Sequence, residues 1–426
     1  MSTLQLGSEC IHAGYHAANA EARQLPIVQS TTFLYERCEE MAKCFDLESN
    51  LYFYTRLANP TSDAVAAKIA VLEGGKGAIL TSSGQAATFY AVFNICQAGD
   101  HVVASSAIYG GSFNLFNVTM RRMGVKFSFV PPHATPEELE AAIQDNTKAV
   151  FVETLSNPSL DICDLERFAA VAHAHGLPLI VDNTFATPIL CRPLDWGADI
   201  VVHSTTKYMD GHAAAVGGAI VDGGRFDWRA HAAAFPELTK ADASYHGMIY
   251  AERFPETAYL MKILAQLMRD LGATPSPQNA FLLNLGLETL HLRMPRHSEN
   301  ALRLAAYLNR HPKIDWVRYP GLEGDSQHAL AQKYLPHGAS GVLAIGVHGG
   351  REAAMRLMAG LSVFSIATHV ADIRSCVLHP ASTTHRQLSD AELHACGVRP
   401  EMVRVSCGCE TADDLLGDFE QALAQV

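Results

Sequence analysis

The chain has 426 residues, of which 48% are hydrophobic and 18% charged, and its formal net charge is −12. This balance is typical of a globular protein long enough for two domains. The acidic charge and the lack of any run of Lys or Arg argue against a nucleic-acid-binding protein, because affinity for phosphate backbones comes from clustered basic residues. A small-molecule ligand fits this composition better.

Targeting and metal signals are also weak. No uninterrupted apolar segment reaches bilayer-spanning length, and the N-terminal stretch has no basic region followed by an apolar one, so we expect a cytoplasmic protein. The 10 cysteines are scattered without CxxC spacing, which favours reduced thiols over disulfides or a zinc site. The 20 histidines form no HExxH pattern, and we expect no catalytic metal.

The N-terminal part, residues 1–60, shows little amphipathic helix apart from Cys38 to Leu47 and is expected to form an extended arm. Arms of this kind wrap a neighbouring subunit or remain mobile. Near the end of the arm, Tyr54 and Arg56 are two residues apart and point to the same side of an extended segment. A phenol and a guanidinium together suit a phosphate group.

The next segment carries a candidate phosphate site. A helix is predicted from Thr61 to Gly74, followed by a short strand from Ala78 to Thr81. The following residues, Ser83, Gly84 and Gln85, open another helix. Small residues at such a junction expose backbone N–H groups, and the helix dipole adds positive character.

Strands and helices then alternate as far as Ile220, which predicts a mostly parallel sheet covered on both faces. The predicted strands are Val102–Val103, Val125–Val130, Ala149–Val152, Leu179–Val181 and Ile200–Val202. Polar residues follow three of them: Tyr109, then Glu153 with Asn157, then Asp182. We expect these groups to meet at the carboxyl edge of the sheet, where ligands of such folds bind.

The last of these strands leads into Ser204, Thr206 and Lys207. A desolvated lysine loses its proton well below its ordinary pKa, and its amine can then form a Schiff base with an aldehyde. Two hydroxyls beside it suit a phosphate. Pyridoxal phosphate needs an amine, an acid for its ring nitrogen, a ring to stack on and a phosphate cup. The sequence therefore predicts a pyridoxal phosphate site, with Asp182 as the acid.

The remaining chain divides into a connecting region and a second domain. Residues 222–271 show few regular signals and are expected to form a functional or interface loop. Helices from Pro277 to Leu290 and on to Asn309 are expected to join two domains. Later strands at Trp316–Tyr319, Val342–Val347 and Met402–Val405 predict a smaller α+β domain. The predicted parts are thus an arm (1–60), a large cofactor-binding domain (61–275) and a small domain (276–426).

At this point the motifs YTRLANPT, SSGQAA, IYGG, ETLSNP, VDNTF, HSTTKY and VRVSCGCE, in this order, carry a resemblance. The chain resembles, over essentially its whole length, the Cys/Met-metabolism family of pyridoxal-phosphate enzymes. That family includes cystathionine synthases and lyases, methionine γ-lyase and homoserine-ester sulfhydrylases. The resemblance implies an α/β protein with the fold of type I pyridoxal-phosphate-dependent transferases.

The resemblance also implies roles for individual residues. Lys207 would bind the cofactor aldehyde and move protons, Asp182 would pair with the ring nitrogen, and Tyr109 would stack on the ring and assist at the leaving group. The other residues implied to bind cofactor are Ser83, Gly84, Gln85, Asn157, Ser204, Thr206 and, from a neighbouring subunit, Tyr54 and Arg56. Arg404 would grip the substrate α-carboxylate, with Ser365 near the same group, although Ile366-Ala367 replaces the family's usual leucine-glycine.

Within the family, FPELTKADASYHGMIY and IYGGSFNLF look like segments of O-acetylhomoserine sulfhydrylases. Gly111 stands where methionine γ-lyases tend to have cysteine. The leading hypothesis is a transferase that makes L-homocysteine and acetate from O-acetyl-L-homoserine and sulfide. A methionine γ-lyase, another trans-sulfuration enzyme such as cystathionine γ-synthase or γ-lyase, and a non-catalytic α/β binding protein remain as alternatives. If Tyr54 and Arg56 serve a neighbour, the active unit is at least a dimer, and the family suggests a tetramer.

Overall fold

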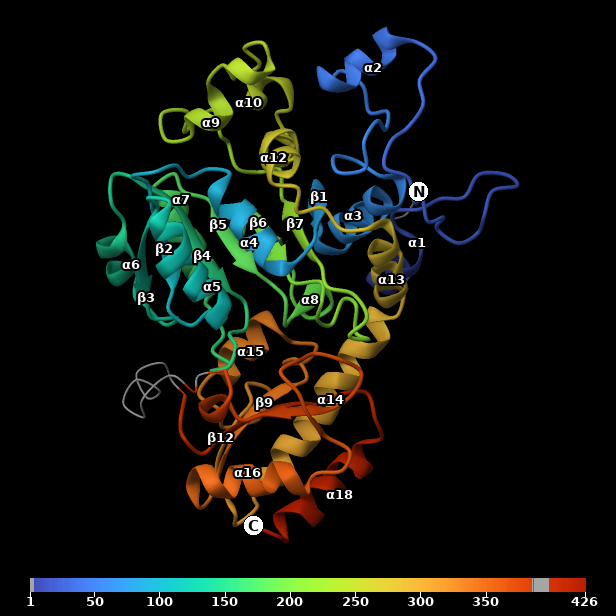
Figure 1. The fold of residues 1–426 in the computed structure, drawn as a ribbon. Coiled ribbons are helices and arrows are strands. Elements are labelled where there is room, and N and C mark those ends of the chain that lie inside the picture. Colours follow the sequence, from blue (N-terminus) through green and yellow to red (C-terminus); the bar gives the residue numbers. More distant parts are fainter. Residues whose placement is uncertain (1–3, 385, 387–397) are drawn as a thin grey trace.

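The computed structural model describes residues 4–384, 386 and 398–426 and contains two sheets (Figure 1). The larger sheet has seven strands in the order β1-β7-β6-β5-β4-β2-β3. Its strands are β1 (Gly77–Thr81), β2 (His101–Ser105), β3 (Lys126–Val130), β4 (Thr147–Glu153), β5 (Leu179–Asp182), β6 (Ile200–His203) and β7 (Gly218–Asp222). The strand β7 is antiparallel to both of its neighbours, and the other neighbouring strands are parallel. The predicted mostly parallel sheet is confirmed.

The strand β7 was not predicted, and its glycines explain why. Gly217 and Gly218 interrupt the apolar pattern, since glycine weakens a strand and carries no side chain to pack. The structure needs glycine there, because a Cβ on Gly218 would lie 2.3 Å from the backbone oxygen of Ser83. The glycine that interrupts the apolar pattern of β7 thus allows this strand to lie next to the turn that begins α4.

Helices cover both faces of the large sheet (Figure 1). One face packs against α4 and the helical turns around Phe116, and the other packs against α3, α7 and α8. Alternate residues of each strand face the two layers: Ile180 belongs to the first core and Val181 to the second. The helices of this part are α3 (Pro60–Glu73), α4 (Gly84–Phe93), α5 (Gly110–Asn114), α6 (Pro136–Ala142), α7 (Leu165–Ala174) and α8 (Thr187–Leu190).

The segment 222–271 is more regular than the sequence indicated. It forms the short helices α9 (Pro236–Thr239), α10 (Tyr250–Arg253), α11 (Ala258–Lys262) and α12 (Arg269–Leu271). Its buried aromatic residues join the core on the α4 side of the sheet. Tyr259 ties the segment to α4, because its hydroxyl donates to the carbonyl of Ala91 at 2.5 Å and its own carbonyl accepts from Asn94 at 3.0 Å. The segment therefore braces the helix that begins at the predicted phosphate site.

The second sheet has five strands in the order β10-β11-β12-β9-β8. They are β8 (Ile314–Arg318), β9 (Val342–Val347), β10 (Ser365–Ile366), β11 (Cys376–Leu378) and β12 (Met402–Ser406). The helices α13 (Pro277–Glu288), α14 (Leu290–Leu308), α15 (His328–Tyr334), α16 (Gly350–Gly360) and α18 (Ala412–Leu423) belong to this half of the chain. In Figure 1, α13 and α14 run from beside the large sheet to the small one. The fold class predicted from the sequence is thus confirmed, whereas the exact domain boundaries stay a prediction.

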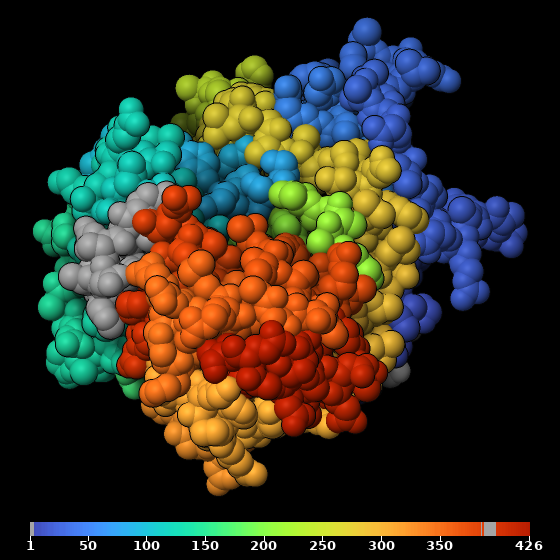
Figure 2. Space-filling model, turned by 60° about the horizontal axis from the view of Figure 1, so that its bottom comes forward, coloured from blue at the N-terminus to red at the C-terminus, as the bar shows by residue number. Residues whose placement is uncertain are grey.

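From residue 4 to the start of α3, the described chain forms the helices α1 (Leu6–His12) and α2 (Cys38–Phe45), and parts of this segment project from the body (Figure 2). It exposes large apolar side chains: Leu34 is 100% exposed, Phe45 59% and Leu51 56%. An apolar surface of this kind is typical of a segment that packs against another chain.

Within 4–384, 386 and 398–426, no helix combines the length and apolarity needed to cross a membrane. The same ranges contain no cluster of three or more side chains suited to bind a metal ion.

Candidate active site

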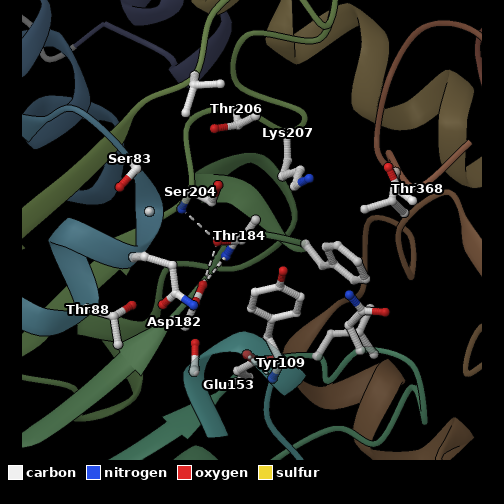
Figure 3. A pocket seen from close by; sticks show the side chains of 18 of the residues that line it. Ser83, Thr88, Tyr109, Glu153, Asp182, Thr184, Ser204, Thr206, Lys207 and Thr368 are labelled. Atoms are coloured by element: carbon white, nitrogen blue, oxygen red, sulfur yellow. Dashed lines mark hydrogen bonds between the residues drawn. The ribbon is translucent and has the colours of Figure 1, made fainter. Parts of the chain in front are cut away.

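A cavity of about 240 Å³ lies at the carboxyl ends of the large sheet's central strands, where the small sheet meets it (Figure 3). The sequence-predicted residues that line it are Ser83, Gly84, Gln85, Tyr109, Asn157, Asp182, Ser204, Thr206, Lys207 and Arg404. They come from segments more than 300 residues apart along the chain. The structure therefore gathers these groups around one space, as expected for the carboxyl edge of such a sheet.

Lys207 follows β6 and extends its ammonium group into the cavity (Figure 3). Burial lowers the pKa of Lys207, and the positive charge of Arg404 lowers it further. A lysine whose pKa is lowered holds more of its amine in the neutral, nucleophilic form near neutral pH. The position and the pKa both suit a group that attacks an aldehyde.

Asp182 ends β5 and is fixed by Thr184. Its Oδ1 accepts the Thr184 hydroxyl at 2.5 Å and the Thr184 backbone N–H at 3.0 Å. Burial raises the pKa of Asp182, while these two bonds and the nearby His203 act to lower it. Thr184 was not singled out from the sequence, although an Asp followed two residues later by Thr is a pattern that permits this local bond.

The predicted phosphate cradle is formed by the start of α4 and the loop after β6. Ser83 caps α4, since its Oγ accepts the backbone N–H of Ala86 at 3.1 Å. A Cβ on Gly84 would lie 2.5 Å from the Cβ of Ser204, so only glycine lets the two loops come this close. Thr206 is held by Gly217, to which its hydroxyl donates and from which it accepts, each at 3.1 Å. Helix N-terminal N–H groups and fixed hydroxyls are the donors that a phosphate requires.

Tyr109 precedes α5, and its ring lies in the cavity (Figure 3). Its backbone N–H donates to Oε1 of Glu153 at 2.6 Å. Glu153 is only 6% exposed and lines the same cavity, although the sequence pattern indicated only a polar strand end at this position. A Cβ on Gly111 would lie 2.4 Å from the Tyr109 ring and 2.5 Å from the Gln85 amide, so the ring packs closely over this glycine.

Arg404, on β12, is 7% exposed and reaches the cavity from the small sheet. It donates to Oδ1 of Asn157 at 3.3 Å and to the carbonyl of His369 at 3.0 Å. A guanidinium held in this way presents a fixed positive charge to a substrate anion.

The structure does not place Ser365 with Arg404. Ser365 is exposed on β10, pairs with Cys376 of β11, and donates to the carbonyl of Ser375 at 3.3 Å. Residues of the following loop, Thr368 and Val370, line the cavity instead. Pairing with β11 keeps Ser365 at the sheet edge and outside this cavity, and its predicted place near the substrate carboxylate stays a prediction.

Tyr54 and Arg56 also lie outside the cavity of their own chain. Tyr54 is 41% exposed, and the Arg56 guanidinium sits 5.0 Å from the centre of its ring. That these two residues bind the cofactor in a neighbouring subunit stays a prediction.

The cavity thus offers each group that pyridoxal phosphate requires. It contains an amine of lowered pKa, an acid fixed through one oxygen, an aromatic ring and a cradle of N–H and hydroxyl donors. The collision that any side chain at Gly84 would cause shows that the cradle is built for close backbone approach. Fold and site together define a pyridoxal-phosphate-dependent enzyme of fold type I.

Comparisons with known proteins give the family. The model of the Cys/Met metabolism PLP-dependent enzyme family matches residues 7–424, and the chain belongs to this family. A homocysteine synthase of Schizosaccharomyces pombe is 45% identical over 423 residues, covering 99% of this chain and 97% of the relative. An O-acetyl-L-homoserine sulfhydrylase of Leptospira meyeri is 43% identical over 414 residues, covering 95% and 93%.

A solved structure adds the cofactor. A protein of Campylobacter jejuni described as an O-acetylhomoserine (thiol)-lyase aligns with a TM-score of 0.95 and 37% identity over 99% of this chain and 100% of its own. That structure contains N'-pyridoxyl-lysine-5'-monophosphate, a lysine joined to the cofactor. The family resemblance and the cofactor predicted from the motifs are confirmed.

Proposed function

We propose that the protein catalyses γ-replacement, converting O-acetyl-L-homoserine and sulfide into L-homocysteine and acetate, a step of methionine biosynthesis. The observation that carries this proposal is that Lys207 and Arg404, from different sheets, face the same cavity. Such a pair supplies a proton acceptor and a carboxylate grip for an amino acid. Relatives named homocysteine synthase and O-acetyl-L-homoserine sulfhydrylase support the choice of substrate.

Bound pyridoxal phosphate supplies an electron sink for the charge that develops on the substrate. The cradle of Gly84, Gln85, Ser204 and Thr206 holds its phosphate, and Asp182 holds the proton on its ring nitrogen. Asn157, which also lines the cavity, would hold the ring hydroxyl.

Arg404 orients the amino acid by its α-carboxylate. Lys207 removes the α-proton and returns protons at later steps, and its lowered pKa suits this task. Tyr109 provides a phenol near the departing acetate.

The charges around the cavity favour an acetyl over a succinyl ester. Among the described residues that line it, the cations are Lys207 and Arg404, and both already have a role. A succinyl ester would bring a second carboxylate, which would be desolvated without a partner. Leu155, Phe185 and Val216 add apolar surface that suits a methyl group.

A methionine γ-lyase uses related chemistry and is the second candidate. Such lyases tend to carry cysteine at the position of Gly111, where a Cβ would lie 2.4 Å from the Tyr109 ring and 2.5 Å from the Gln85 amide, so a cysteine would require these side chains to move. This observation favours the sulfhydrylase.

The test uses the purified, cofactor-loaded protein. O-acetyl-L-homoserine is supplied alone, with sulfide or with L-cysteine, O-succinyl-L-homoserine with sulfide, and L-methionine alone, while homocysteine, cystathionine and 2-oxobutyrate are assayed. Homocysteine formed from the acetyl ester only when sulfide is present supports the proposal. Release of 2-oxobutyrate from methionine alone would favour the lyase, and cysteine accepted better than sulfide would favour a cystathionine γ-synthase.

The proposal includes a homo-oligomer of at least two subunits, a tetramer by analogy with the family, in the cytoplasm. The exposed apolar side chains of the arm and the position of Tyr54 and Arg56 outside their own cavity support the oligomer. Light scattering during size-exclusion chromatography tests it, and an active monomer would overturn it. Cell fractionation tests the location.

A further inference from the structure

Two carboxyl groups meet at the base of the cavity. Glu153 ends β4, Asp182 ends β5, and the two are register partners in neighbouring parallel strands. Both line the cavity (Figure 3). Two carboxylates so close together in a poorly solvated site repel each other, and one of them takes up a proton at a pH where an ordinary acid would be ionised.

The hydrogen bonds indicate which of the two keeps the charge. Asp182 accepts two bonds from Thr184, one of them a short hydroxyl bond of 2.5 Å. Glu153 accepts the backbone N–H groups of Tyr109, at 2.6 Å, and of Asn157, and is 6% exposed. Burial and the charge of Asp182 raise the pKa of Glu153 well above its usual range. At Asp182 the bonds from Thr184 and the nearby His203 oppose the effect of burial.

The other ionisable groups that line the cavity are Lys207 after β6, Arg404 on β12 and the phenol of Tyr109. Arg404 donates hydrogen bonds to Asn157 and to the carbonyl of His369, and its positive charge lowers the pKa of Lys207. Burial and the charge of Asp182 raise the pKa of Glu153, and the backbone N–H groups of Tyr109 and Asn157 act to lower it. Which of the two acids carries the proton is therefore decided by groups at the ends of β4 and β5.

We propose that Glu153 is a positioning residue held as a neutral carboxylic acid, which fixes the backbone of Tyr109 while leaving Asp182 as the single anion of the pair. The inference rests on the proposed roles of Tyr109 and Asp182. Through its bond to the Tyr109 N–H, Glu153 fixes the position of the Tyr109 ring in the cavity. Because Glu153 is protonated, it does not act as a second anion that competes with Asp182 for the proton on the ring nitrogen of pyridoxal phosphate.

The proposal separates two substitutions. Glu153→Gln keeps a neutral side chain of the same size and an oxygen that can accept the Tyr109 N–H. Glu153→Leu removes the acceptor and leaves that N–H unpaired. Asp222→Asn serves as the matched control, because Asp222 is also a buried acid at a strand end, its pKa is raised to about 7, and its Oδ1 accepts the Gly224 N–H at 2.8 Å, yet it lies outside the cavity.

The first experiment measures protonation directly. An infrared difference spectrum between the full-length wild type and Glu153→Gln, recorded near neutral pH, is expected to contain the carbonyl stretch of a protonated carboxyl in the wild type. A difference spectrum that contains only carboxylate bands would overturn the proposal.

The second experiment measures pyridoxal phosphate affinity across the neutral pH range. Glu153→Gln and Asp222→Asn are expected to bind within about twofold of the wild type with the same pH profile. Glu153→Leu should bind about tenfold more weakly or worse, as when a buried donor loses its acceptor. A pH profile displaced in Glu153→Gln by about one unit would show that an anion had been removed, and would overturn the proposal even if Glu153→Leu fails to fold.

These results remain distinguishable from failure of the proposed function. A loaded protein that makes no homocysteine would reject the sulfhydrylase assignment, whereas the infrared band of the same chain would still decide the state of Glu153.

Discussion

Thr184 joins the two halves of the cofactor site through a single hydroxyl. This hydroxyl donates to Oδ1 of Asp182 at 2.5 Å and accepts the backbone N–H of Ser204 at 2.9 Å. Asp182 ends β5, whereas Ser204 begins the loop after β6 that carries Thr206 and Lys207. The acid proposed to face the ring nitrogen is therefore fixed relative to the loop proposed to bind the phosphate.

Replacing Thr184 should change the pH dependence of activity. Thr184→Val removes a hydrogen bond that favours ionised Asp182, so the pKa of Asp182 rises further. Since the reaction needs ionised Asp182, activity is lost on the acid side, and the acid limb of kcat/KM should move up by about one unit. Thr184→Ser keeps the hydroxyl and should leave the limb in place. An acid limb that is identical in the wild type and Thr184→Val would show that this bond does not control Asp182.

Replacing Lys207 should abolish both activity and the covalent attachment of the cofactor. Lys207→Ala is expected to lower kcat by about 10³-fold and to lose the visible absorption band of lysine-linked pyridoxal phosphate. Lys68 is the matched control, because it is also buried with a pKa lowered by burial, yet lies outside the cavity. Lys68→Ala should keep the band. If Lys207→Ala remained coloured to the same degree, another amine would hold the cofactor.

The charge of Arg404 should control the reactivity of Lys207 towards the cofactor. Because that charge lowers the pKa of Lys207, Arg404→Leu should raise this pKa and move the pH dependence of cofactor association to higher pH. The lowered pKa of Lys207 in the wild type also affects stability. Lys207 binds fewer protons in the folded chain than in the unfolded chain, so its contribution to the free energy of unfolding grows as pH rises towards the ordinary lysine pKa. Stopped-flow absorbance of pyridoxal phosphate mixed with unloaded protein measures the association rate. Equal pH profiles for both proteins would contradict the coupling.

Much of this site could be predicted because its signals are local. Apolar runs ending in polar residues placed Asp182 and Lys207 at adjacent strand ends, and the glycine of SSGQAA marked the turn before α4. The role proposed for Glu153 could not be predicted from the sequence, because it depends on the register between β4 and β5 and on a bond to Tyr109, 44 residues away.

The position of Ser365 outside the cavity could not be predicted for a related reason. It depends on the pairing of β10 with β11, and the cavity is lined by Thr368 and Val370 of the following loop instead. Contacts between distant segments carry no local pattern in one sequence.

The arm provides the strictest test of the oligomer. We expect Arg56→Ala to weaken pyridoxal phosphate binding even though Arg56 lies outside the cavity of its own chain, because its guanidinium is proposed to bind the phosphate in a neighbouring subunit. Lys207→Ala and Arg56→Ala should each be nearly inactive alone. After the two variants are unfolded together and refolded, a mixed pair has one site with an intact Lys207 and a partner's intact Arg56. Random pairing should then restore about a quarter of wild-type activity.

The control mixes Lys207→Ala with Arg404→Leu. Both residues line the cavity of the same chain, so every site in the mixed pair lacks one of them, and no activity should return. Recovery in the first mixture and not in the second would place Arg56 in the neighbour's site. If neither mixture recovers although each wild-type control refolds, Arg56 does not act across the interface, and the exposed pair of Tyr54 and Arg56 would then be a surface feature of the arm.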